Sequence, residues 1–226
     1  MSWRQLGGSA DPVAPHSSPR AVDRGRRTGI VVNTVLYRLR LEHADRLPPA
    51  GPVVVVANHQ HLLDGAVLFG CLPRRVAFLV KAEVVKGPLG WLLRAVGQYA
   101  VVRGTPDREP LMHALAQLKA GGVVGIFPEG TRGSGNVDAV FNGAGWLAAR
   151  AGAPVVPVAI RGTVRPAGSR RRFRPVVTVL VGAPFRVPTG GGRKPVAEAT
   201  DAIRVQLAAL VRQLDDELAR TGAATA

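Results

Sequence analysis

The sequence has one cysteine, no long apolar run and few acidic residues, and each shortage excludes a class of protein. Cys71 is the single cysteine of the 226 residues, which excludes a disulfide framework or a cysteine-rich zinc site and fits a reducing compartment. The longest apolar runs, Pro52–Ala57 and Ala153–Ile160, are far shorter than the roughly 18–20 residues of a membrane-spanning helix. The N-terminal segment has no apolar stretch, so we expect no secretory signal peptide.

The shortage of acidic residues leaves a large positive charge. There are 30 Lys and Arg against 15 Asp and Glu, a net charge of +15. Most of the cations are arginine, which favours bidentate contacts to phosphate. The stretch from Arg161 to Pro195 is basic throughout, with no Asp or Glu. The charge therefore indicates a phosphate-bearing partner, which is a nucleic acid, an anionic membrane surface or a phosphorylated small molecule.

Short runs of Val and Ile alternate with segments of helical periodicity. Near-continuous apolar strands are typical of sheets covered on both faces, so this alternation predicts an α/β domain with a largely parallel central sheet flanked by helices. Strands are expected at Val53–Ala57, Val76–Val80, Tyr99–Val102, Val123–Phe127, Val155–Ile160 and Val176–Val181. Helices are expected at Leu62–Gly70, Leu89–Val96, Arg108–Ala120, Gly143–Ala151 and Val196–Arg220. Sites in such sheets gather at the carboxyl ends of strands.

The two ends of the chain are expected to lie outside the folded domain. Residues 1–27 are rich in Pro, Ser, Gly and Arg without apolar periodicity, which predicts a flexible basic tail. A single domain is expected over residues 28–220, followed by a flexible tail over 221–226. Its first segment, Thr28–Leu41, has helical spacing with arginines near its end. It is either a helix packed on its own domain or a basic helix lying on a membrane.

The residues after the first expected strand are candidates for acid–base chemistry. His59 is followed five positions later by Asp64, whose carboxylate can hold one imidazole nitrogen while the other takes a proton from a hydroxyl. On one regular helix the two side chains would point about 140° apart, so they meet only if His59 lies in the loop and Asp64 in the first helical turn. A structural alternative is that they cap and complement the start of the helix.

Two other functions are compatible with the residues. His59, His61 and Asp64 form an H-x-H-x-x-D cluster of the kind that metallo-hydrolases use, although His113 is the one further ligand candidate that follows. The arginine-rich stretch also fits a basic module that binds membrane or nucleic acid, in which case binding to nucleic acid would depend steeply on salt.

Two more strand ends carry groups suited to phosphate. Glu129, Gly130, Thr131 and Arg132 follow Pro128 in a tight turn after the strand that ends near Phe127. Arginine beside free backbone amides can form a phosphate-binding site, although the same turn could hold an ordinary surface ion pair. Arg103 lies at the end of another expected strand.

These strand ends, taken in order, resemble the four-block signature of glycerolipid acyltransferases, and most closely the bacterial 1-acyl-sn-glycerol-3-phosphate acyltransferases. The blocks are His59-x4-Asp64, Gly97-x-Tyr99-x3-Arg103, Phe127-Pro128-Glu129-Gly130-Thr131-Arg132 and Val156-Pro157-Val158-Ala159-Ile160. The resemblance spans about residues 36–184. It implies a glycerol-3-phosphate-acyltransferase-like fold and transfer of a fatty acyl group from acyl-CoA or acyl-carrier protein to the hydroxyl of a lysophospholipid.

The resemblance also implies a role for each candidate residue. His59 is the expected general base and Asp64 its partner. Arg103 and the residues Glu129, Gly130, Thr131 and Arg132 are expected to hold the substrate phosphate, while Pro157 shapes the acyl-donor side. Backbone amides near the helix after His61 are expected to stabilise the oxyanion. No metal or organic cofactor is expected.

The implied substrate and the charge together predict a peripheral enzyme on the cytoplasmic face of an anionic membrane, with no transmembrane helix and no nucleic-acid partner. The chain departs from the family pattern at two positions. His61 stands where the family often has Ser, and Asn142, after Phe141, stands where it often has Lys. The second departure removes a positive charge near the expected phosphate region.

Overall fold

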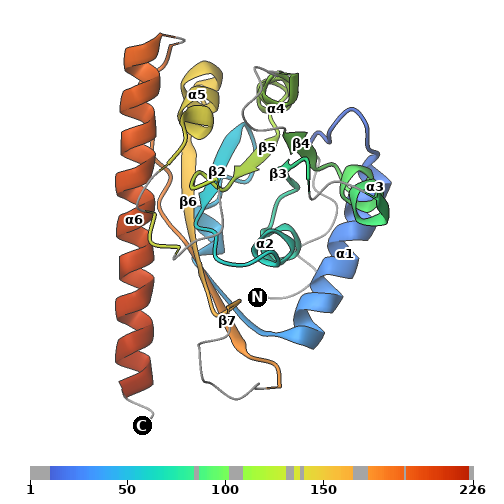
Figure 1. The fold of residues 1–226 in the computed structure, drawn as a ribbon, viewed down its shortest axis with the longest axis vertical. Helices are drawn as coiled ribbons and strands as arrows, with labels where there is room; N and C mark the ends of the chain where they lie inside the picture. Colours follow the sequence, from blue (N-terminus) through green and yellow to red (C-terminus); the bar gives the residue numbers. More distant parts are fainter. Residues whose placement is uncertain are drawn as a thin grey trace.

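The computed structural model describes residues 11–83, 87–101, 109–130, 135–137, 140–164, 173–190 and 192–223, and its core is a seven-stranded sheet (Figure 1). The strand order is β1-β7-β6-β2-β5-β3-β4, and every neighbouring pair is parallel except β6 with β7. The strands are β1 (Arg38–Glu42), β2 (Val53–Ala57), β3 (Val76–Lys81), β4 (Tyr99–Val101), β5 (Val123–Ile126), β6 (Val155–Arg161) and β7 (Val176–Val181). The predicted α/β fold with a largely parallel sheet is confirmed.

Helices cover both faces of the sheet (Figure 1). They are α1 (Pro19–Leu36), α2 (Asp64–Cys71), α3 (Gly87–Ala95), α4 (Glu109–Lys119), α5 (Asn142–Ala151) and α6 (Arg193–Ala223), with a short 3-10 helix η2 (Ala44–Arg46). No helix in the described part of the chain combines the length and the apolar character that crossing a membrane requires.

The central strand β2 shows why its sequence is a continuous apolar run. Val54 and Val56 belong to the core layer under α4, α5 and α6, whereas Val53, Val55 and Ala57 belong to the layer under α2. All five side chains are fully buried. Because successive residues of a strand point to opposite faces, both halves of the run must be apolar, and each buried valine contributes about 1.5–3 kcal/mol.

The expected helix over Thr28–Leu41 is wrong at its C-terminal end. Helix α1 ends at Leu36, Tyr37 is extended, and residues 38–42 form the edge strand β1, which pairs in parallel with β7. The segment Arg-Leu-Arg-Leu-Glu alternates charged and apolar residues, which is the period of a strand with one covered face. The apolar spacing that continued from α1 concealed this change of period.

The expected flexible tail over residues 1–27 is wrong for residues 11–27. Helix α1 already begins at Pro19, where the Ser18 side chain caps it by accepting a hydrogen bond from the backbone of Ala21. The preceding segment is held by the buried ion pair of Asp11 with Arg74 and by the packing of Ala14 in the core, and α1 itself by the ion pair of Asp23 with Arg75. At the other end α6 continues through Ala223, so residues 221–223 extend the last helix.

Candidate active site

The loop between β2 and α2 brings His59 and Asp64 together at the carboxyl end of the central strand. Helix α2 begins at Asp64, while His59 lies in the loop before it, as the spacing of the two residues requires. His59 Nδ1 lies 3.1 Å from Asp64 Oδ2. The same oxygen accepts hydrogen bonds from the backbone amides of Gln60 at 2.8 Å and His61 at 2.7 Å. Asp64 therefore organises the whole loop, and its side chain is fully buried.

Asp64 is an ionised carboxylate at neutral pH. Burial alone would raise its pKa, but the hydrogen bonds from His59 and from the backbone of His61 and Gln60, together with the nearby Thr163 hydroxyl, hold the pKa below its usual range. Because the pKa is lower in the folded protein, ionisation of Asp64 stabilises the fold above the pKa of the unfolded chain. That contribution is lost as the pH falls through the folded pKa.

Two contacts hold the imidazole of His59, and a third holds its backbone. Its ring stacks on Phe127, with centroids 4.2 Å apart and planes inclined by 23°. Its backbone N–H donates to Glu129 Oε1 at 2.9 Å. With Nδ1 on Asp64, the ring nitrogen left for a substrate is Nε2, and the side chain is 18% exposed. The ring is thus oriented so that Nε2 can accept a proton from a hydroxyl, with limited access to solvent.

Asn58 fastens the end of β2 to β6. Its side-chain oxygen accepts from the backbone N–H of Ile160 at 2.8 Å, and its side-chain nitrogen donates to the carbonyl of Ile160 at 3.1 Å. The fully buried amide therefore extends the pairing of the two strands beyond its last backbone register, Ala57 with Val158. This role of Asn58 could not be predicted from the sequence, because its partner lies 102 positions away.

The turn after β5 lies against the same loop. The half-buried Glu129 carboxylate accepts a hydrogen bond from the backbone N–H of His59, and burial raises its pKa despite that hydrogen bond. Gly130 closes the turn by donating its N–H to the carbonyl of Phe127 at 3.1 Å. The contact joins the loop that carries His59 to the turn after β5, whereas a carboxylate would repel the phosphate that Glu129 was expected to help hold.

Arg161, at the end of β6, is a second residue that sequence reasoning missed. Its guanidinium makes two hydrogen bonds to Asp215 of α6, at 2.7 and 2.8 Å. It also donates to the carbonyl of Gly135 at 3.2 Å and to the side chain of Asn136 at 3.3 Å. We expected its charge to serve a bilayer with the basic stretch that follows, but the structure uses it to brace α6 against the segment near Glu129.

Several expected site residues are not brought together by what the structure describes. Arg103, Thr131 and Arg132 lie outside the described residues. Pro157 is buried within β6, its carbonyl accepting a hydrogen bond from Gly182 at 2.9 Å. The His61 ring accepts from the backbone of Leu63 at 3.3 Å. No cluster of three or more His, Cys, Asp or Glu side chains within the described ranges is arranged to hold a metal ion.

Three of the backbone amides near the start of α2 already have side-chain acceptors. The amides of Gln60 and His61 donate to Asp64, and that of Leu63 donates to the His61 ring. These three amides therefore hold the side chains of Asp64 and His61 and are not free to donate to a thioester. The expectation named backbone amides near this helix, and the sequence alone does not reveal which side-chain acceptors compete for them.

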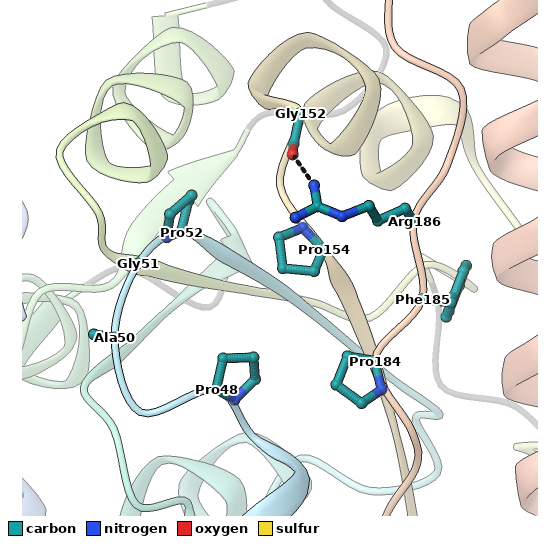
Figure 2. A pocket seen from close by; sticks show the side chains of 9 residues that line it. All are labelled: Pro48, Ala50, Gly51, Pro52, Gly152, Pro154, Pro184, Phe185 and Arg186. Carbon is teal, nitrogen blue, oxygen red and sulfur yellow. Dashed lines mark hydrogen bonds between the residues drawn. The ribbon is translucent and has the colours of Figure 1, made fainter.

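Neither Cys71 nor the large cavity belongs to this site. Cys71 is buried, and burial raises the pKa of its thiol to about 12, which keeps it protonated. A cavity of about 460 Å³ opens beside Pro52 and Pro154, at the amino ends of β2 and β6 (Figure 2). Its one charged lining residue, Arg186, donates to the carbonyl of Gly152 at 3.3 Å. His59 lies at the opposite end of β2.

Comparison with known proteins gives a consistent family. The family model described as Acyltransferase matches residues 38–161. The chain is 34% identical over 164 residues to 1-acyl-sn-glycerol-3-phosphate acyltransferase beta of Homo sapiens, covering 69% of this chain and 58% of that protein. It is 40% identical over 115 residues to lyso-ornithine lipid O-acyltransferase of Pseudomonas aeruginosa, covering 50% of this chain and 44% of the relative.

A solved structure supports the same assignment. The crystal structure of the 1-acyl-sn-glycerophosphate acyltransferase PlsC from Thermotoga maritima is similar with a TM-score of 0.66 and 26% sequence identity. The match covers 86% of this chain and 79% of that chain. The chain spans little more than half of the human relative's length, so the relatives' complete activities are not transferred by the alignment alone.

Proposed function

The chain belongs to the acyltransferase family, and from this premise we propose that it transfers a fatty acyl group from an acyl thioester to the free hydroxyl of a lysophospholipid. The proposed acceptor is 1-acyl-sn-glycerol-3-phosphate and the product phosphatidate. The observation that carries the proposal is the pair of His59 and the fully buried Asp64, joined at 3.1 Å. The donor is acyl-CoA or acyl-carrier protein.

In the proposed mechanism His59 acts as the general base. Its Nε2 takes the proton of the acceptor hydroxyl while the hydroxyl oxygen attacks the thioester carbonyl, and Asp64 stabilises the imidazolium that forms. The tetrahedral intermediate then collapses, the carbon–sulfur bond breaks, and the imidazolium returns its proton to the leaving thiolate. The ester and the free thiol are the products. This route needs no protein nucleophile and so no ionised Cys71.

The proposed phosphate-binding site is the turn after β5 together with the residues that follow β4. Arg132 would supply a bidentate contact, Thr131 a hydroxyl and Arg103 a second cation. The proposal is supported by the position of the neighbouring Gly130, whose turn is joined to the catalytic loop through Glu129. An acceptor phosphate at this turn would place its hydroxyl next to the strand end that carries His59.

The test is an assay of the purified protein with labelled acyl-CoA and acyl-carrier protein against a panel of acceptors, with product mass measured. We expect lysophosphatidate to be acylated at least tenfold faster than glycerol-3-phosphate or neutral lysolipids. Lyso-ornithine lipid belongs in the panel, because one relative acts on it and because Asn142 removes a charge expected near the phosphate. A preference for lyso-ornithine lipid would mean that the acceptor is an amino-acid lipid rather than lysophosphatidate. The absence of acylation with every acceptor would contradict the proposal.

We also propose that α1 and α3 form the face that lies on the membrane. Their exposed apolar side chains include Val31 and Val35, which are about 60% exposed, and Trp91, which is 73% exposed. The two helices are adjacent, since Gly25 of α1 packs directly on Val96 just after α3. Arginines on α1 add positive charge, so the face combines apolar and basic groups as interfacial helices do.

The membrane proposal predicts that Trp91→Ser combined with Val35→Ser lowers binding to vesicles containing anionic lipid. A loss of about tenfold is expected from two exposed apolar side chains. Vesicle flotation at low salt measures it, and Val205→Ser on α6, whose valine is 43% exposed, is the matched control. If wild-type protein does not float with anionic vesicles, or if the control reduces binding equally, this assignment of the face is wrong.

A further inference from the structure

Two buried polar atoms beside the catalytic pair have no hydrogen bond of ordinary geometry. They are Asp64 Oδ1 and the hydroxyl oxygen of Thr163, and they are two of only four such side-chain atoms among the described residues. Buried polar atoms are nearly always paired, so each exception needs an explanation. Here the two exceptions are an acceptor and a donor whose residues meet at the same place, since the Thr163 hydroxyl contributes to the lowered pKa of Asp64.

The backbone fixes Thr163 beside the catalytic loop. Asn58 bonds both backbone groups of Ile160, so the end of β6 is held against the start of the loop that carries His59. Two residues further on, Gly162 has φ of +94° and lies against the carbonyl of Val176, where a Cβ would collide. This left-handed conformation turns the chain sharply after β6, which Gly alone tolerates. Thr163 is 9% exposed as a result.

The two oxygens of Asp64 have different tasks. Oδ2 accepts three hydrogen bonds, from His59 Nδ1 and from two backbone amides, and these leave no room for a fourth donor. Oδ1 is free to accept, and an ionised carboxylate gains most when both of its oxygens are bonded. A donor on Oδ1 would also prevent the carboxylate from rotating about its Cβ–Cγ bond, which would change the direction of Oδ2 toward His59.

We propose that Thr163 is a positioning residue for acyl transfer, whose hydroxyl donates to Asp64 Oδ1 and so fixes the carboxylate that orients His59. The inference rests on the proposed function, because the effect on catalysis passes through His59 as general base. Thr163 touches neither substrate nor reacting atoms. Its hydroxyl is needed, whereas its methyl group serves packing alone.

The test compares Thr163→Val with Thr163→Ser. The valine keeps the shape and removes the donor, so kcat is expected to fall about tenfold, the effect of losing a hydrogen bond to a charged group, with KM for the acyl donor unchanged. The pair of His59 and Asp64 should hold its proton more tightly, which moves the acid limb of the pH–rate profile to higher pH. Serine should restore kcat and the profile.

A measurement without substrate separates this inference from the proposed function. Carbon-13 NMR of the labelled aspartate should show the pKa of Asp64 higher in Thr163→Val than in the wild type and the serine variant. The control is Thr200→Val, where a hydroxyl of similar burial bonds the carbonyl of Val196 within α6. If the valine variant does not fold, Thr163→Ala carries the same comparison.

The outcomes are distinct. An active wild type whose kcat, pH profile and Asp64 pKa are unchanged in Thr163→Val overturns the positioning role and leaves the function intact. Equal losses in the valine and serine variants overturn it too, because shape rather than the hydroxyl would then be responsible. A wild type without acyl transfer overturns the proposed function, and a raised Asp64 pKa in the valine variant would still support the contact.

Discussion

Acyl transfer is expected to disappear when His59 is replaced by alanine, with kcat/KM falling about 10²–10⁴-fold. The variant loses the nitrogen that takes the acceptor's proton, while Asp64 keeps its hydrogen bonds from the backbone of Gln60 and His61 and continues to hold the loop. The activity is measured in an assay with labelled acyl-CoA and lysophosphatidate, and a thermal unfolding experiment checks that the variant keeps its fold. Full activity of the variant would contradict the mechanism.

His61→Ala is the matched control, since it removes an imidazole two positions away. The His61 ring accepts one weak hydrogen bond, from the backbone of Leu63 at 3.3 Å, and its hydrogen bonds with Asp64 come from its backbone N–H and carbonyl. Substantial activity is therefore expected to remain. Equal inactivity of the two variants, together with loss of bound zinc in a metal analysis of the purified proteins, would favour a metallo-hydrolase built on the same cluster.

The sheet could be predicted from the sequence because its strands are buried on both faces. A run such as Val176–Val181 has one structural interpretation, and the structure has a strand at those residues. The edge strand β1 could not be recognised in the same way. Leu39 and Leu41 alternate with charged residues in a segment that directly follows a helix, and two leucines do not distinguish a period of 2 from one of 3.6.

The contact between His59 and Asp64 could also be predicted, because the two residues are near in sequence and the chain between them has one geometry that joins them. Thr163 and Arg161 could not. Their partners, Asp64 and Asp215, lie on other elements far along the chain, and a single sequence contains no information on which distant polar groups meet. Each had the same sequence signal as any polar residue at a strand end.

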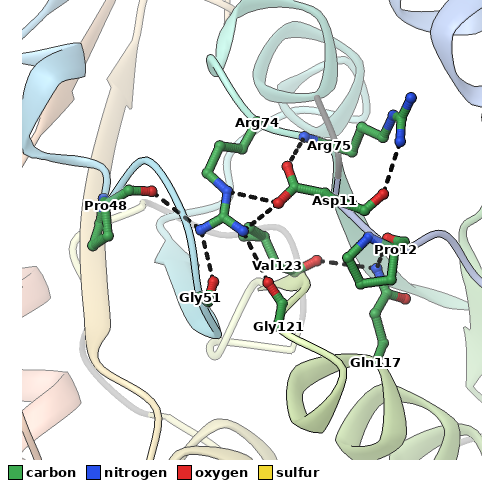
Figure 3. A network of polar contacts seen from close by, with 9 residues as sticks. All are labelled: Asp11, Pro12, Pro48, Gly51, Arg74, Arg75, Gln117, Gly121 and Val123. Carbon is green, nitrogen blue, oxygen red and sulfur yellow. Dashed lines mark hydrogen bonds and ion pairs between the residues drawn. The ribbon is translucent and has the colours of Figure 1, made fainter. Parts of the chain in front are cut away.

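The prediction of a flexible N-terminal tail was wrong for the same physical reason, because the contacts that hold the segment are made to distant residues. The same segment gives the prediction with the largest expected effect on stability. Arg74 is almost fully buried and forms an ion pair with Asp11, while its guanidinium also donates to the carbonyls of Pro48, Gly51 and Gly121 (Figure 3). One side chain therefore joins the N-terminal segment to the loop before β2 and the loop before β5. Such a network has no apolar periodicity, so composition alone indicated a tail.

Arg74→Met is expected to lower the free energy of unfolding by about 3–5 kcal/mol, because it leaves the Asp11 carboxylate buried without its cation. Urea denaturation measures the change. The matched control is Arg204→Met on α6, whose ion pair with Asp201 is exposed and should contribute less than about 1 kcal/mol. Equal effects of the two variants would show that burial does not make the Arg74 network different from a surface pair.

Adding Asp11→Asn to Arg74→Met separates the ion pair from the other contacts of Arg74. If the loss comes from a stranded charge, the double variant should recover part of the stability, since the neutral amide is far less costly to bury than a carboxylate. If the loss comes from the three carbonyls, the double variant should be no more stable than Arg74→Met. Because Asp11 also bonds the backbone and side chain of Arg75, which pairs with Asp23 of α1, full recovery is not expected. A recovery of about half would mean that the charge pair and the carbonyl contacts both contribute to the stability that Arg74 provides.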